Sequence, residues 1–181
     1  MQVPPEDRVV GMRIANINSL TERFGKTVLR EAVFMERLSA HPFGVGLHSA
    51  MVDKLARISE AREFESGEYL WKQGDHTQAL HLLGSGRVAL EIFIPHQGPL
   101  QIETVGTGDL IVCSWVVAPY RWHFDARALQ NVSTVVVDGK SLHRQCDEDP
   151  ILGYEVLKRL SHFQELRLQK ARLRILELHS H

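Results

Sequence analysis

Cysteine is scarce in this chain. Only Cys113 and Cys146 occur among the 181 residues, and they do not form a CxxC pair. Two isolated cysteines do not make a disulfide framework, so the sequence predicts a reducing, cytoplasmic compartment.

Long hydrophobic runs are lacking as well. The longest apolar run, residues 110–117, is interrupted by Cys113 and Ser114 and is far too short to span a bilayer. The first residues also lack the basic segment followed by an apolar segment that marks a secretory signal. We therefore expect neither export nor an association with a membrane.

The chain also lacks an excess of charge of either sign. The chain has 21 Lys and Arg against 22 Asp and Glu, which gives a net charge of −1. This balance provides no overall attraction to nucleic acid or to an anionic membrane. The 44% of hydrophobic and 24% of charged residues are typical of a globular protein, and the length suits one domain with helical extensions.

The first part of the chain predicts two helices. Apolar residues recur at spacings of three and four over 20–38 and again over 49–59, and His41-Pro42-Phe43-Gly44 separates the two segments. Residues 1–20 are weakly patterned, so we expect a loosely ordered arm there. The expected organisation has three parts: an N-terminal arm and helix (1–40), a β-barrel (41–138) and C-terminal helices (139–181).

Short strands are expected from residue 61 onward, because the apolar period changes and Gly and Pro recur between the segments. In Arg87–Ile94, alternate residues are apolar, and Gly84-Ser85-Gly86 before it predicts a tight hairpin. This pattern predicts a mainly β fold with flanking helices, built as a jelly-roll barrel. Residues 61–64 lead to a turn at Gly67-Glu68, and the expected strands are 69–72, 79–83, 87–94, 100–105, 124–129 and 133–137.

The C-terminal segment 151–178 is rich in leucine and predicts one long helix. One apolar stripe is enough to pack on the chain's own barrel, so a second stripe predicts a homodimer through this helix. A frayed terminal helix with surplus leucines is the alternative. The first stripe holds Leu157, Leu160, Phe163, Leu166, Leu173 and Leu176, and the second holds Leu168, Ala171, Ile175 and Leu178.

An ordered set of short motifs runs through the β region. Its members are Gly67-Glu68, Gln73-Gly74-Asp75, Gly86 before a long strand, Gly106-Thr107-Gly108-Asp109 and Ala126-Arg127-Ala128-Leu129. In this order and at this spacing, the set resembles the cyclic-nucleotide-binding domain of Crp/Fnr regulators and cyclic-nucleotide-dependent kinases. The resemblance covers roughly residues 41–178 and implies the cyclic-nucleotide-binding type of jelly roll with a long C-terminal helix.

The chain departs from this family where the phosphate-binding cassette should follow the 106–109 turn. Nucleotide-binding members carry a glycine, then a glutamate that holds the ribose, and near the cassette's end an arginine that pairs with the cyclic phosphate. Val112 and Cys113 stand at the first two positions and Trp122 at the third. A cyclic phosphate needs a fixed cation and several N–H donors, and Trp122 offers no charge. The resemblance therefore implies a degenerate phosphate site.

The candidate ligand-binding residues are those of this cassette. Its aromatic side chains could stack on a planar ligand or could fill the core as a plug. Arg121, Arg127 or Arg87 could restore anion binding, and Cys113 could act as a thiol sensor. The string 119–128 also resembles a bacterial subgroup of small single-domain proteins of this kind. The full set of candidates is Val112, Cys113, Ser114, Trp115, Arg121, Trp122, His123, Asp125 and Arg127.

We expect a non-catalytic sensor or regulatory domain that acts through a small-molecule ligand or a protein partner, without a cofactor. The alternative is a genuine cAMP or cGMP receptor in which Arg121 binds the phosphate. The sequence ends at His181 without a helix-turn-helix, so we expect no sequence-specific DNA binding by this chain alone.

An enzyme is the third possibility. His123 and Asp125 are two residues apart on an expected strand, so they share a face and could form an acid–base pair. A cupin-like metal site would need an HxH motif on a strand, whereas the only HxH motif is His179-Ser180-His181 at the chain end. We therefore expect no metal.

Overall fold

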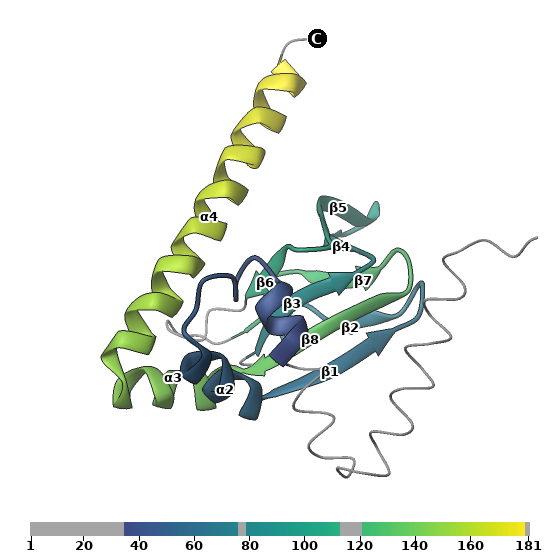
Figure 1. Ribbon diagram of the computed structural model, residues 1–181. Helices are drawn as coiled ribbons and strands as arrows, with labels where there is room; N and C mark the ends of the chain where they lie inside the picture. Colours follow the sequence, from purple (N-terminus) through teal and green to yellow (C-terminus); the bar gives the residue numbers. More distant parts are fainter. Residues whose placement is uncertain (1–34, 76–78, 113–120, 180–181) are drawn as a thin grey trace, which may run out of the picture.

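The computed structural model describes residues 35–75, 79–112 and 121–179. In this part of the chain, two four-stranded antiparallel sheets lie against each other, and the long helix α4 (Pro150–His179) runs along one side and extends beyond them (Figure 1). The predicted mainly β fold with flanking helices and a long C-terminal helix is confirmed.

The strand order is that of a jelly roll, because neighbours in each sheet come from distant parts of the sequence. We call the two sheets the helix-side sheet and the outer sheet. The helix-side sheet has the order β1 (Ser59–Phe64), β8 (Val132–Asp138), β3 (Ala79–Ser85) and β6 (Leu110–Val112). The outer sheet has the order β2 (Tyr69–Trp71), β7 (Asp125–Ala128), β4 (Arg87–Ile94) and β5 (Gly98–Gly106).

The helices begin where polar side chains bind free backbone N–H groups. The Asp138 carboxylate accepts the Ser141 N–H at 2.8 Å, just before α3 (Gly139–Glu148). The Asp149 carboxylate accepts the N–H groups of Ile151 and Leu152 at the start of α4. Such caps stabilise a helix by about 1 kcal/mol each. The predicted helix at 49–59 corresponds to α2 (Ser49–Arg57), and residues 35–40 are helical as well.

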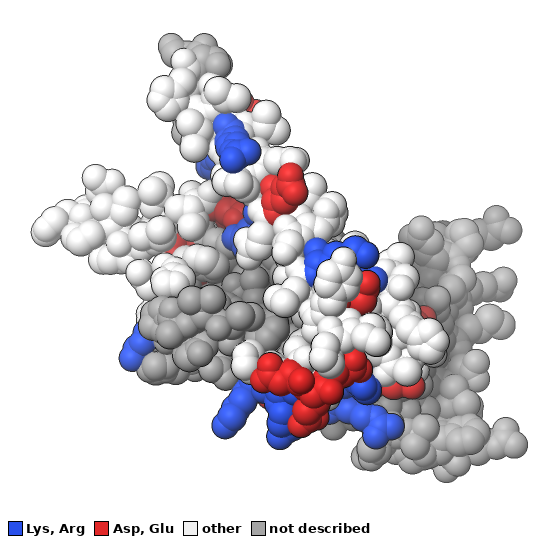
Figure 2. Space-filling model, turned by 90° about the vertical axis from the view of Figure 1, so that its left-hand side faces the viewer, with Lys and Arg blue, Asp and Glu red and all other residues white. Residues whose placement is uncertain are grey.

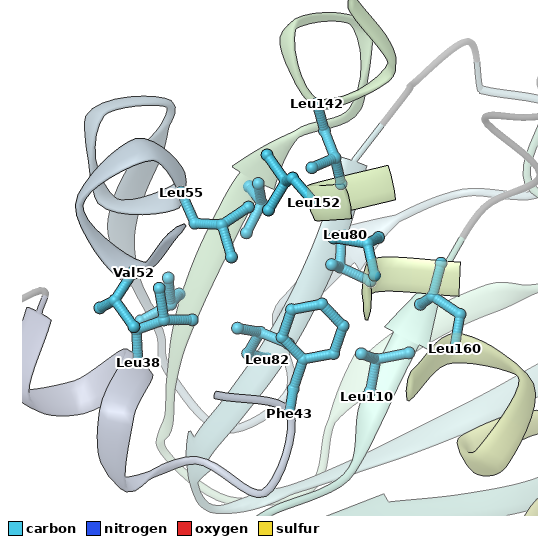
Figure 3. Packing of buried hydrophobic residues seen from close by; sticks show 13 residues of the cluster. Leu38, Phe43, Val52, Leu55, Leu80, Leu82, Leu110, Leu142, Leu152 and Leu160 are labelled. Atoms are coloured by element: carbon cyan, nitrogen blue, oxygen red, sulfur yellow. The ribbon is translucent and has the colours of Figure 1, made fainter. Parts of the chain in front are cut away.

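Two apolar cores stabilise this arrangement. The first lies between the helices and the helix-side sheet (Figure 3) and includes Leu38, Phe43, Leu55, Leu80, Leu82 and Leu152. The second lies between the two sheets and includes Trp71, Leu83, Val88, Leu90, Ile111 and Trp122. Strand β3 serves both cores, because alternate side chains of a strand point to opposite faces.

The predicted hairpin at Gly84-Ser85-Gly86 is wrong. β3 pairs with β6 and β8, whereas β4 pairs with β5 and β7, so the glycines carry the chain from one sheet to the other. Gly86 has φ +88°, and a Cβ atom there would lie 2.3 Å from the carbonyl oxygen of Asn131. The glycines that suggested a hairpin thus form a corner between the two sheets. At this corner the chain passes close to the backbone of residues 131–132.

Burial along β4 does not follow the predicted alternation. Val88 and Leu90 are buried, but Ala89 and Glu91 are buried too, and Ile92 is 37% exposed. The register with β5 shifts between Leu90 and Glu91. The extra residue belongs to β5, because the consecutive β4 residues Leu90 and Glu91 pair with Glu103 and Gln101. The pairing of β4 with β7 ends at Glu91, so Ile92 lies beyond the edge of β7.

The buried side chains of α4 lie in its first half, whereas its second half contacts β5 through polar side chains. Leu152, Val156 and Leu160 are buried, and Phe163 is partly buried against the same core. The first predicted stripe therefore packs on the barrel core only at Leu160 and Phe163. Side chains of the predicted stripes that are 40% to 63% exposed are Leu157, Leu166, Leu168, Leu173, Ile175 and Leu176.

Substituting Gly86 tests the corner between the sheets. We expect Gly86→Ala to lower the free energy of unfolding by about 3 kcal/mol, because it adds a backbone clash to the cost of a positive φ. Gly67→Ala is the matched control, since Gly67 has φ +93° and a Cβ atom there would have no other atom within 4 Å. It should cost only about 1 kcal/mol. Equal losses in urea denaturation of the two variants would contradict the close approach at Gly86.

Candidate functional site

A cavity of about 660 Å³ opens at the end of the barrel. It is lined from the helix-side sheet by residues of β1, β3 and β8, and from the outer sheet by residues of β2. The residues of this lining that carry polar or aromatic side chains include Glu60, Arg62, Trp71, Asp75, His81 and Trp122. Among the predicted site residues that the structure describes, only Trp122 belongs to the lining.

Trp122 is the centre of an aromatic cluster inside the cavity. It is 2% exposed, and its ring stacks on Trp71 with 3.8 Å between centroids and 12° between planes. His81 meets Trp122 edge-on at 6.0 Å, and Phe124 lies tilted at 6.1 Å. The Trp71 indole N–H donates to the Phe124 carbonyl oxygen at 3.1 Å, which fixes the orientation of the stack.

Two polar atoms of this cluster are buried without a hydrogen bond among the described residues. They are Nδ1 of His81 and Nε1 of Trp122. An unpaired polar atom in a protein interior costs about 1–3 kcal/mol. Such atoms are rare in stable folds, so two of them in the lining of one cavity mark it as a candidate ligand site.

The His81 imidazole is neutral at physiological pH. Burial lowers its pKa to about 3, and the positive charge of Arg62 adds to that shift. A neutral imidazole has one N–H donor and one acceptor nitrogen, so it can form one hydrogen bond of each kind with a ligand.

The charged residues of the lining give the cavity a negative balance. Three carboxylates, those of Glu60, Asp75 and Asp138, face one guanidinium, that of Arg62. Arg62 is already paired with Glu60 at 2.6 Å. Local fields of this sign oppose the entry of an anion.

Asp125 and Arg121 hold the rim of the cavity together. The Asp125 carboxylate accepts the Gln73 N–H at 2.7 Å and pairs with Lys72 at 3.2 Å. Arg121 Nη1 donates to the Gly74 carbonyl oxygen at 2.9 Å. Gly74 N–H also donates to the Trp122 carbonyl oxygen at 2.8 Å. These bonds place Trp122 against the 73–75 turn, which explains why a Gln-Gly-Asp motif lies at this point.

Arg127 points away from the cavity. Along β7, Ala126 and Ala128 are buried between the sheets, so Arg127 lies on the opposite face of the outer sheet. Its guanidinium binds the buried Glu91 carboxylate, and this hydrogen bond raises the pKa of Arg127.

The other predicted site residues are not brought together. His123 is exposed, and the Asp125 oxygens bind Gln73 and Lys72, so the hypothetical His123–Asp125 pair gains no support from the geometry. Val112 is the last residue of β6 and pairs with Leu80. Cys113, Ser114 and Trp115 lie outside the described residues. In the described part of the chain, no group of three or more His, Cys, Asp or Glu side chains is arranged to hold a metal ion.

Sequence reasoning missed His81, Trp71, Glu60 and Arg62. A signal for His81 exists, because it is the one polar residue in the apolar run Ala79–Leu83. A buried polar side chain in such a run needs a hydrogen-bond partner. The sequence does not show that this side chain lies against the cassette.

The titration of His81 gives a test of its burial. The unfolded chain binds a proton at this residue below pH 6.5, whereas the folded chain does so only near pH 3. Stability is therefore lost as the pH falls from 6.5 toward 3, by about 2 kcal/mol between pH 7 and pH 5. We expect His81→Phe to remove this part of the pH dependence in urea denaturation.

His96→Asn is the matched control, because His96 is exposed and asparagine tolerates its φ of +68°. It should retain the pH dependence of the wild type. A His81→Phe variant whose stability changes with pH as steeply as that of the wild type would contradict the buried, neutral state of His81.

No helix of the described residues combines the length and the apolar character that crossing a bilayer requires.

Comparison with known proteins identifies the barrel. The family model of the cyclic nucleotide-binding domain matches residues 61–149. This span includes both the 73–75 turn and Trp122.

Solved structures with the same fold come from regulators and kinases. The chain is 26% identical to a putative cyclic nucleotide-binding protein from Geobacter metallireducens, with a TM-score of 0.64 over 74% of this chain and 96% of that one. The sensor domain of a transcriptional regulator from Pseudomonas aeruginosa is 19% identical, with a TM-score of 0.62 over 77% and 93% of the two chains. The regulatory subunit of a cAMP-independent protein kinase A from Trypanosoma brucei is 20% identical, with a TM-score of 0.62 over 80% and 53%.

The predicted resemblance to the cyclic nucleotide-binding domain family is confirmed, because the family model matches residues 61–149 and the chain shares the fold of these structures.

Proposed function

We propose that this chain is a non-catalytic, cytoplasmic sensor domain of the Crp/Fnr type, whose barrel cavity no longer recognises a cyclic phosphate. It acts through another small-molecule ligand and passes the signal to a partner. The single observation that carries the proposal is Trp122. It stands at the position of the phosphate-binding arginine, and it is buried in a stack with Trp71.

The cations near the cavity support this proposal, because each has another partner. Arg62 pairs with Glu60, Arg121 donates to Gly74, and Arg127 binds Glu91 on the other face of the sheet. A cyclic phosphate needs a cation with free donors to replace its hydration. To bind a phosphate, one of these three arginines would have to break its present interaction, and the free energy of that step would weaken phosphate binding.

A fold neighbour provides a parallel. The Trypanosoma brucei regulatory subunit belongs to a kinase that is cAMP-independent, and a mutant of that subunit is bound to cAMP. Independence from cAMP therefore occurs in a protein with this fold. We infer the same for the present chain from its own cavity residues.

Ligand occupancy could reach α4 through His41. Its Nδ1 accepts the Phe43 N–H at 3.1 Å and its Nε2 donates to the Asp109 carbonyl oxygen at 3.2 Å, which defines a neutral tautomer. Burial lowers the pKa of His41, which favours that state. The ring also stacks on Phe163 of α4 at 6.3 Å. One side chain thus joins the turn that precedes the cassette to the long helix.

A genuine cyclic-nucleotide receptor is the second candidate. Arg121 favours it, because this exposed side chain is one residue from Trp122 and the bond described for it goes to a single backbone carbonyl. If Arg121 exchanged that bond for a phosphate, a cation would reach the cavity rim.

Calorimetry distinguishes the two candidates. We expect cAMP, cGMP and c-di-GMP to give no saturable heat at a Kd below about 10 μM, which corresponds to roughly −7 kcal/mol. A saturable heat that Arg121→Ala abolishes would establish the receptor. Arg144→Ala, at an exposed position of α3, is the control for loss of an arginine elsewhere.

We further propose that the chain forms a homodimer through the second half of α4. Arg167 pairs with Glu103 at 2.6 Å and Arg174 donates to the Ile102 carbonyl oxygen at 3.3 Å, so this row of the helix faces β5. Leu168 follows Arg167 in the sequence, and Ile175 follows Arg174. Leu168 and Ile175 are seven residues apart, as the two arginines are, so they form an exposed apolar row next to the row of arginines.

The surface around this helix supports the dimer. On the face shown in Figure 2, acidic and basic side chains gather at the bottom, and the upper helix carries mostly uncharged surface. Exposed apolar rows along a long helix are typical of helix pairs between chains.

Light scattering at micromolar concentration tests the dimer. We expect the wild type to have twice the chain mass, and the double variant Leu168→Glu/Ile175→Glu to have the mass of one chain, because burying a carboxylate without a partner is costly. Ser161→Glu adds a charge at another exposed position of α4 and should remain a dimer. A monomeric wild type would refute the proposal.

A further inference from the structure

The unpaired atoms of His81 and Trp122 define what the cavity accepts. The inference rests on the proposed function, since it names the ligand class of the same site. The two residues come from distant parts of the chain, β3 and the segment before β7, and their rings meet at 6.0 Å. A single small molecule could therefore contact both.

The two atoms have complementary requirements. The Trp122 indole N–H can only donate, so it needs an acceptor. The neutral His81 ring can offer its lone pair or its N–H. A ring nitrogen or carbonyl oxygen beside an N–H group matches this pair, and that combination is common in nitrogen heterocycles.

Charge excludes an ionic ligand at this end of the cavity. The burial that keeps His81 neutral would also penalise a charged group beside it. The lining also holds three carboxylates against one guanidinium, which opposes an anion in particular. Trp71 and Trp122 already stack on each other at 3.8 Å, so a planar, uncharged ring would extend this aromatic stack and would not enter between the two indoles.

We propose that the barrel cavity binds an uncharged nitrogen heterocycle that accepts a hydrogen bond from the Trp122 indole N–H and forms a second one with His81. This ligand needs no cyclic phosphate. His81 is thus a ligand-binding residue, and Arg121 serves to hold the 73–75 turn in place.

The Trp122 indole N–H provides a direct test by nuclear magnetic resonance. Its resonance is assigned with Trp122→Phe, and the Trp71 indole, which already donates to Phe124, is the internal reference. The probes are adenine, hypoxanthine, thymine and adenosine, each added up to about 5 mM, which covers Kd values well above 1 mM. We expect at least one probe to shift the Trp122 resonance downfield in a saturable manner.

The matched ligands are adenosine and cAMP, which share a base and a sugar and differ by the cyclic phosphate. We expect cAMP to bind no more tightly than adenosine. His81→Phe should weaken binding of the active probe at least about tenfold, a change of about 1.4 kcal/mol. His96→Asn should bind it like the wild type.

Failure of this proposal and failure of the proposed function give different results. If none of the probes shifts the Trp122 resonance, the ligand class is wrong while the loss of phosphate recognition stands. If a probe binds equally well to His81→Phe, the role of His81 is wrong. If cAMP binds at least about tenfold more tightly than adenosine, the phosphate is recognised and both proposals are overturned.

Discussion

The stack of Trp122 on Trp71 is the interaction on which the rest of the site depends. The two rings bring β2 of the outer sheet and the end of the cassette into one apolar cluster, with His81 against their edges. The 73–75 turn closes over the cluster through bonds to the Trp122 backbone. In the proposed function, this stack takes the place of the family's phosphate site, so the cavity is expected to bind a neutral, planar ligand.

The sequence predicted the fold because the family motifs are local backbone requirements. Gly74, Gly86 and Gly108 all have positive φ, which only glycine adopts readily, so their spacing reports where the chain must turn. It could not tell a hairpin from a corner at Gly86, since both need the same backbone. The burial of Glu91 could not be predicted either, because Glu91 pairs with Arg127 of β7, and a pattern within β4 does not report that contact.

The site was predictable only in part. Trp122 was predicted as a site residue by counting back from Arg127-Ala128, a motif that lies close to it in the sequence. Its partners could not be predicted, since Trp71 and His81 reach it through strand pairings that join residues about 50 positions apart. The exposed second half of α4 could not be foreseen either. The helical pattern continues through it, and only the extent of the sheets decides where burial against the barrel core ends.

The central claim is that Trp122 replaces the phosphate-binding arginine within a closed aromatic stack. A crystal structure determined after co-crystallisation with cAMP tests it most directly. We expect Trp122 to remain stacked on Trp71 and Arg121 to remain bound to the Gly74 carbonyl, with no phosphate held in the cavity. A cyclic phosphate bound by the Arg121 guanidinium, with Trp122 displaced from Trp71, would contradict it.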